Sequence, residues 1–195
     1  EVDANYFQHL DYLEDFNEKN GTHLVSAAGI HYEPMGIFPC KDKSATLDKI
    51  ADGAKIAIPN DTTNEARALQ LLVAEGLIEL DPEAGLEATP KDVTKNEHKI
   101  EFVEMEAAAL PTVLADVDFA VINGNYALGA GLTEADGLAF EAADSEAAKT
   151  YTNALVVKEG NEDNPAIKKL VEALTSDECR AFLEEKYKGM VIPVF

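Results

Sequence analysis

The sequence predicts an α/β protein in which strands alternate with helices and most strands run parallel. Short apolar runs of strand length recur along the chain, and segments with the helical period lie between them. Polar turns separate the two kinds of segment. This alternation is typical of sheets covered by helices, and 195 residues suffice for one domain or for two small lobes.

The first predicted element is a helix over residues 6–19, which the pair Asn20-Gly21 ends. Its apolar side chains recur near the helical period and are Tyr6, Phe7, Leu10, Leu13 and Phe16. Extended segments broken by Pro34 and Gly36 follow.

The stretch IAIPNDTTNEARALQLL, residues 56–72, joins a strand to a helix. A short helix and an Asp-Gly turn are expected just before it, in SATLDKIADGAK. The helix after the strand should cover residues 63–75 and stop at Gly76. Its buried face is predicted to consist of Ala66, Leu69, Leu72 and Val73.

The second half of the chain repeats this alternation. A helix is expected over residues 110–117, where apolar residues stand at i, i+3, i+4 and i+7. The apolar run 119–122 reads as a buried strand, and the turn NGNYA follows it. Another strand is expected over 153–160, and two helices hinged near residues 175–177 close the chain.

Composition excludes several classes of function. A net charge of −21 argues against binding nucleic acid or an anionic membrane surface through charge. No stretch approaches 18 uninterrupted apolar residues, so no membrane span is predicted. Cys40 and Cys179 are far apart and have no metal-type spacing, which favours two free thiols over a disulfide. No histidine pair has zinc spacing, so neither a metal nor a cofactor is expected.

Two polar loops follow predicted strands, at 59–64 and at 123–126. In parallel sheets ligands collect at such strand ends, beside the free N–H groups of the next helix. Of sixteen basic residues only Arg67 and Arg180 are arginine. Arg67 shares a helix face with Asn64, and together they could clamp a carboxylate that is not part of the chain. The alternative is a solvated surface arginine.

The loop NGNYA contributes Asn123 and Asn125, which could serve a ligand or simply form a turn. Aromatic and imidazole side chains gather elsewhere, at Tyr6, Phe7 and His9 and again at His31 and Tyr32. Core packing explains Phe7 equally well, and histidines near aromatic rings are commonly structural. No nucleophile stands beside a base, and no nucleotide-binding or hydrolase motif is present.

Several motifs occur together in a fixed order: DANYFQHLDYL, EPMGI, AIPNDTTNEARALQLL, AVINGNYA, AIKKLVEAL and EEKYKGMVIP. In this combination the whole chain resembles the NlpA family of bacterial lipoproteins, the methionine-binding proteins of methionine ABC transporters. The resemblance implies a periplasmic-binding-protein-like (type 2) fold with a ligand cleft between two α/β lobes. Lobe I would comprise residues 1–38 and 154–195, and lobe II residues 39–153.

The resemblance places the crossovers between lobes near Met35–Cys40 and Thr152–Val157. It also implies that an N-terminal part is missing, because family members begin with a lipobox cysteine, a linker and a first β-α-β unit. The full-length protein would then be lipid-anchored on the extracytoplasmic face of the cell envelope. The resemblance implies that the anchor and the first strands of lobe I lie outside this sequence.

The resemblance also suggests roles for the candidate residues. Arg67 and Asn64 would hold the carboxylate of the ligand, and Asn123, with Asn125 nearby, its α-amino group. The side-chain pocket would be lined by Tyr6, Phe7, His9, His31 and Tyr32. Aromatic walls suit a thioether, because sulfur–aromatic contacts contribute roughly 0.3–1.5 kcal/mol each.

The expected function is therefore capture of methionine, in its L form, by a monomeric, non-enzymatic protein. It would deliver the amino acid to a permease and ATPase complex. One alternative is a receptor for a methionine-containing dipeptide or another apolar amino acid. A second is an enzyme on a related two-lobed scaffold, for which His9 and His31 are the candidate bases.

Overall fold

The computed structural model describes residues 2–40, 45–142 and 150–195. The chain forms two compact units. Unit 1 comprises Glu1–Pro34 and Ala142–Phe195, and unit 2 comprises Met35–Glu141. Both boundaries lie earlier in the chain than the sequence suggested, by four residues at the first and twelve at the second. Each predicted crossover strand therefore belongs to one sheet: the first to unit 2 and the second to unit 1.

Unit 1 is built on a four-stranded sheet with the order β1-β10-β2-β11. Its strands are β1 (Ala4–His9), β2 (Leu24–Tyr32), β10 (Thr152–Lys158) and β11 (Ile192–Pro193). All three pairings are antiparallel. The prediction of mainly parallel sheets is therefore wrong for this unit, whose neighbouring strands come from distant parts of the chain and run antiparallel.

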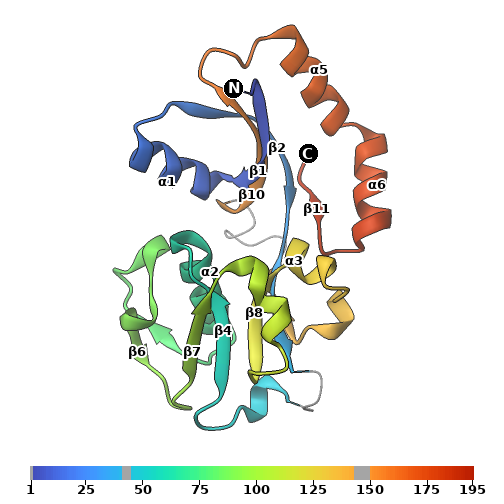
Figure 1. Cartoon of the computed structure of the whole chain (residues 1–195). Helices are drawn as coiled ribbons and strands as arrows, with labels where there is room; N and C mark the ends of the chain where they lie inside the picture. The colour runs from blue at the N-terminus through green and yellow to red at the C-terminus, as the bar shows by residue number, and fades with distance from the viewer. Residues whose placement is uncertain (1, 41–44, 143–149) are drawn as a thin grey trace. The chain divides into compact units, whose positions relative to one another are not determined.

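Among the described residues of unit 1, the helices include α1 (Leu10–Asn20), α5 (Pro165–Leu174) and α6 (Asp177–Tyr187). Figure 1 shows α1 on one side of the sheet strands and α5 and α6 on the other. Leu13 of α1 packs on Ala154 and Val156 of β10. Gly21 ends α1 with φ +61°, as predicted.

The predicted helix over 6–19 is wrong at its start, because residues 6–9 belong to β1. Apolar and aromatic side chains at this spacing satisfy the helical period, but Tyr and Phe also favour strands. Pairing with β10, whose partner residues lie about 150 positions away, decides the conformation. Local periodicity carries no information about that partner.

Unit 2 is built on a five-stranded sheet with the order β7-β4-β8-β3-β9. The strands are β3 (Met35–Pro39), β4 (Lys55–Pro59), β7 (Glu101–Met105), β8 (Phe119–Asn123) and β9 (Ala139–Phe140). β4 is parallel to β7 and β8, whereas β3 is antiparallel to β8 and β9. A two-stranded sheet pairs β5 (Glu79–Leu80) with β6 (Val93–Lys95).

The α-helices of unit 2 are α2 (Thr62–Ala74) and α3 (Gly124–Gly129). The short 3-10 helices are η1 (Leu47–Lys49), η2 (Gly85–Glu87), η3 (Pro90–Asp92), η4 (Ala107–Val113) and η5 (Glu134–Asp136). The helix predicted over 110–117 is thus a 3-10 segment that ends earlier and contains Pro111. The predicted helix over 63–75 matches α2, although Val73 is 37% exposed rather than buried.

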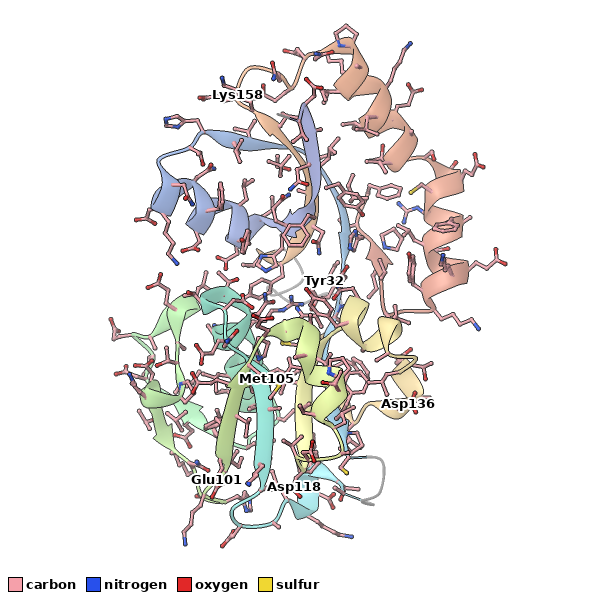
Figure 2. The ribbon with its side chains drawn as sticks, in the orientation of Figure 1. Tyr32, Glu101, Met105, Asp118, Asp136 and Lys158 are labelled. Carbon is pink, nitrogen blue, oxygen red and sulfur yellow. The ribbon has the colours of Figure 1, made fainter. Side chains whose placement is uncertain are left out.

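The three parallel strands of unit 2 end at one edge of the sheet. In Figure 2, Met105 lies at one end of β7 and Glu101 at the other, and Asp118, the residue before β8, lies at the same edge of the sheet as Glu101. The loops that follow β4 and β8 therefore leave the sheet at the edge marked by Met105. This topology places the polar loop before α2 near the start of α3.

Candidate functional site

The polar loop after β4 is organised by Asp61, the N-cap of α2. Its Oδ1 accepts hydrogen bonds from the backbone N–H of Asn64 (3.1 Å) and from Asn64 Nδ2 (2.8 Å). A carboxylate is favoured at this position because the first helical N–H groups lack intrahelical partners. The side chain of Asn64 is thereby fixed at the sheet edge.

Asn123, the last residue of β8, reaches the same place. Its Nδ2 donates to Asn64 Oδ1 at 2.9 Å. The side chain is only 7% exposed, and its Oδ1 has no hydrogen-bond partner among the described residues. A buried acceptor left unpaired costs about 1–3 kcal/mol. The corner formed by Asn64 and Asn123 therefore lacks one hydrogen-bond donor.

Arg67 lies one turn further along α2 and is 2% exposed. It forms a bidentate ion pair with Glu141, with Nε to Oε1 at 2.8 Å and Nη2 to Oε2 at 2.6 Å. The sequence predicted that Arg67 would bind a carboxylate that is not part of the chain, but in the structure the guanidinium is paired with a carboxylate of the chain itself. The alternative of a solvated surface arginine is wrong as well, because the side chain is buried.

Glu141 is held in place by the edge of the sheet. Its backbone N–H donates to Met35 O (3.0 Å), and the backbone N–H of Met35 donates to Glu141 Oε2 (2.8 Å). Phe140, one residue earlier, approaches Gly36 so closely that a Cβ there would lie 2.4 Å from its ring. The absence of a side chain at Gly36 allows β9 to approach and brings Glu141 to Arg67.

Asn125 does not join this corner. It is exposed, and its Oδ1 accepts from the backbone N–H of Tyr126 at 2.8 Å. This bond is the turn chemistry that the motif NGNYA also allowed.

In unit 1, the sheet register aligns three buried polar side chains. Asn153 of β10 lies opposite His9 of β1 and opposite His31 of β2. Their exposed fractions are 8%, 7% and 9%. Sequence reasoning included the two histidines but missed Asn153. A signal existed, because an asparagine near the start of a strongly apolar strand is unusual.

Tyr6, His31 and Glu33 form a hydrogen-bonded series. The Tyr6 hydroxyl contacts His31 Nδ1, and His31 Nε2 lies 2.8 Å from Glu33 Oε1. Burial and the nearby Glu33 carboxylate raise the pKa of Tyr6 well above its usual value, so the phenol stays protonated. A carboxylate only accepts, so His31 Nε2 donates to Glu33.

The other predicted pocket residues differ in exposure. Phe7 is 68% exposed and packs edge-on against Tyr12, so it is not a core residue. His9 caps α1 by accepting from the backbone N–H of Tyr12. Tyr32 is fully buried against Tyr151. Tyr32 is thus a packing residue of unit 1.

A carboxyl group with an unusual pKa lies beside the polar corner. Glu65 of α2 is 6% exposed, and its pKa is raised to about 7 by burial, by a hydrogen bond with Glu104 and by the charges of Glu104 and Asp61. Its Oε1 has no hydrogen-bond partner in the described part of the chain.

Within residues 2–40, 45–142 and 150–195, no three or more His, Cys, Asp or Glu side chains are grouped so as to hold a metal ion. None of the helices described is both long enough and apolar enough to cross a bilayer. Cys40 and Cys179 are both free thiols, as predicted.

Comparison with known proteins places these features in context. The family model described as NlpA lipoprotein matches residues 1–195. Membrane lipoprotein TpN32 of Treponema pallidum is 44% identical over 189 residues, covering 95% of this chain and 67% of that protein. The D-methionine-binding lipoprotein MetQ of Salmonella typhimurium is 40% identical over 192 residues, covering 97% and 69%.

The fold has close counterparts among solved structures. One is a nutrient binding protein from Burkholderia cenocepacia, solved bound to methionine. It superposes with a TM-score of 0.92 at 40% sequence identity, over 100% of this chain and 80% of that one.

Proposed function

Because this chain belongs to the NlpA lipoprotein family, we propose that it is a substrate-binding protein that captures free methionine for an ABC importer. One observation supports the ligand class. A buried corner of unit 2 contains a guanidinium together with an amide oxygen to which none of the described residues donates a hydrogen bond. The polar end of an amino acid supplies a carboxylate for the guanidinium and an ammonium group for the amide oxygen.

The proposed contacts follow from this chemistry. Arg67 and Asn64 attract the carboxylate of the ligand, and Asn123 Oδ1 accepts a hydrogen bond from its ammonium group. Asn64 is ordered by Asp61 and by Asn123 before any ligand arrives. Such preorganisation lowers the entropy lost on binding.

The side chain of the ligand is assigned to the aromatic and imidazole groups of unit 1. Tyr6, Phe7, His9 and His31 are proposed to contact the thioether, and Asn153 is added because of its register with the two histidines. Tyr32 supports them from the core. Thioether sulfur is polarizable and packs well against rings.

A binding role accounts for the histidines better than catalysis does. Both ring nitrogens of His31 are engaged, by Tyr6 and by Glu33, and Nδ1 of His9 caps α1. A general base needs a ring nitrogen within reach of the substrate proton. The inferred partners are the permease and ATPase of the importer, with no nucleic acid. The inferred setting is the extracytoplasmic face of the envelope, where a lipid anchor holds a monomer.

Calorimetry with a panel of ligands tests this proposal: L-methionine, D-methionine, leucine, and dipeptides with methionine at either position. We expect saturable binding with L-methionine the strongest ligand and no turnover of any of them. Tighter binding of leucine or of a dipeptide would contradict the assignment to methionine. Release of a chemically altered product would favour an enzyme.

A further inference from the structure

We propose that Glu141 is a positioning residue for Arg67 that makes the site selective for zwitterions over singly charged ligands. The inference deepens the proposed function and rests on it. Its basis is the bidentate ion pair between these two side chains, which are 7% and 2% exposed. The sequence around either residue does not indicate that the two side chains pair.

The geometry holds the guanidinium in one orientation. Glu141 contacts Nε and Nη2, two atoms on one edge of the planar group. Glu141 is in turn fixed by the backbone N–H of Met35 and by the packing of Phe140 against Gly36. Planar forks bind carboxylates with strong directional preference, so Glu141 sets the direction from which a ligand carboxylate meets Arg67.

The charge count of this corner leads to selectivity. Among the described side chains, Arg67 contributes one positive charge, and the carboxylate of Glu141 pairs with it. Asp61 also lies in the corner, but its Oδ1 accepts from Asn64 and its carboxylate caps the positive end of α2. A ligand that arrives with net charge would therefore leave one buried charge without a counterion, which is costly.

Methionine carries one charge of each sign, so it preserves this balance. Its deaminated analogue, a thioether carboxylic acid, adds a lone negative charge. Its decarboxylated analogue, a thioether amine, adds a lone positive charge. Both keep the side chain, so they isolate the response of the site to charge.

The test compares affinities for methionine and the deaminated analogue in the wild type and in Glu141→Gln. The substitution keeps the shape of the side chain and removes its charge. The corner then favours a monoanion, so we expect the preference for methionine over the analogue to fall on the order of tenfold or more. Glu101→Gln is the matched control, because Glu101 is an exposed acid of the same unit. This variant should keep the wild-type preference for methionine over the deaminated analogue.

Each result decides one question. If wild-type protein does not bind methionine, the proposed function fails. If it binds methionine and Glu141→Gln changes both affinities by the same factor, the function stands and the selectivity inference is wrong. That result would make Glu141 only a competitor for Arg67 or a structural support.

The wild type gives a second test that does not depend on the folding of the variant. We expect both the acid and the amine analogue to bind on the order of a hundredfold more weakly than methionine. Binding of either analogue within about tenfold of methionine would overturn the inference.

Discussion

The candidate site residues of the two units are organised differently. In unit 2 the polar side chains stand at the ends of parallel strands and in the first turns of the next helix, where Asp61, Asn64 and Asn123 are linked in series. In unit 1 the aromatic and imidazole side chains stand on antiparallel strands, in register across the sheet. Parallel topology gathers polar groups at an edge, whereas antiparallel register aligns them across a face.

This contrast has a consequence for energetics. The unit 2 residues form charged and amide hydrogen bonds in a buried setting. Removing one side chain therefore leaves its partner buried without that hydrogen bond. The unit 1 residues include the hydrogen-bonded series of Tyr6, His31 and Glu33. The contacts proposed between this unit and the ligand are mainly ring contacts, which are individually weaker. Substitutions in unit 2 should therefore dominate binding, and the predictions below concern residues of that unit.

The largest effect is expected for Arg67→Ala. It removes the guanidinium from the ligand carboxylate and leaves Glu141 buried without this partner, so methionine affinity should fall by roughly 2–4 kcal/mol. Calorimetry measures the affinity, and a thermal melt reports the loss of stability. Arg180→Ala is the matched control, because Arg180 stacks on the Phe195 ring in unit 1. Equal affinities for Arg67→Ala and the wild type would contradict the clamp.

Asn123→Ala should weaken methionine binding by about 1–3 kcal/mol, because it removes the acceptor assigned to the ammonium group. Asn125→Ala tests the neighbouring amide in the same helix start. Its side chain is exposed, so its effect should stay below about 0.5 kcal/mol. If calorimetry showed similar losses of methionine affinity for the two variants, the assignment of the ammonium group to Asn123 would be wrong.

Gly36→Ala should destabilise unit 2 by roughly 1–3 kcal/mol, because the new Cβ would lie 2.4 Å from the Phe140 ring. The displacement would also carry Glu141 away from Arg67. Chemical denaturation measures the loss. Gly129→Ala is the control, since nothing lies within 4 Å of its Cβ position and its φ is not positive. If the two variants are equally stable, β9 does not depend on this close approach.

The smallest effect is expected for Glu65→Gln. The folded pKa of Glu65 is raised to about 7, so the folded state holds a proton that the unfolded chain has already released. This contribution to stability is fully present below the unfolded pKa and is lost as pH rises through about 7. Solvent reaches the exposed partner Glu104 and screens part of this difference, so relative to wild type the variant should gain about 1 kcal/mol at a pH near 8 and little near 5. Thermal melts at both values measure it, and a gain at the lower pH alone would contradict the sign.

The sequence predicted some parts of the fold well for physical reasons. α2 has a complete local code, with an Asp cap, an apolar face and a terminating glycine, and the structure follows it. The two C-terminal helices and their hinge are local features of the same kind. Asn64 and Asn123 were also predicted to share a strand-end edge, and a hydrogen bond links them.

Other parts depend on distant residues and were missed. β1 forms because β10 pairs with it, and the antiparallel sheet of unit 1 follows from the same long-range contacts. Glu141 could not be recognised as the partner of Arg67, because it is one of 37 acidic residues and lies 74 positions away. Only the pairing of β9 with β3 brings them together.

A crystal structure of the protein with bound L-methionine tests the central claim most directly. We expect the ligand carboxylate within hydrogen-bond distance of the Arg67 guanidinium, and its ammonium group donating to Asn123 Oδ1. A ligand whose carboxylate contacts other groups, with Arg67 bound only to Glu141 and Asn123 Oδ1 still lacking a donor, would contradict the account.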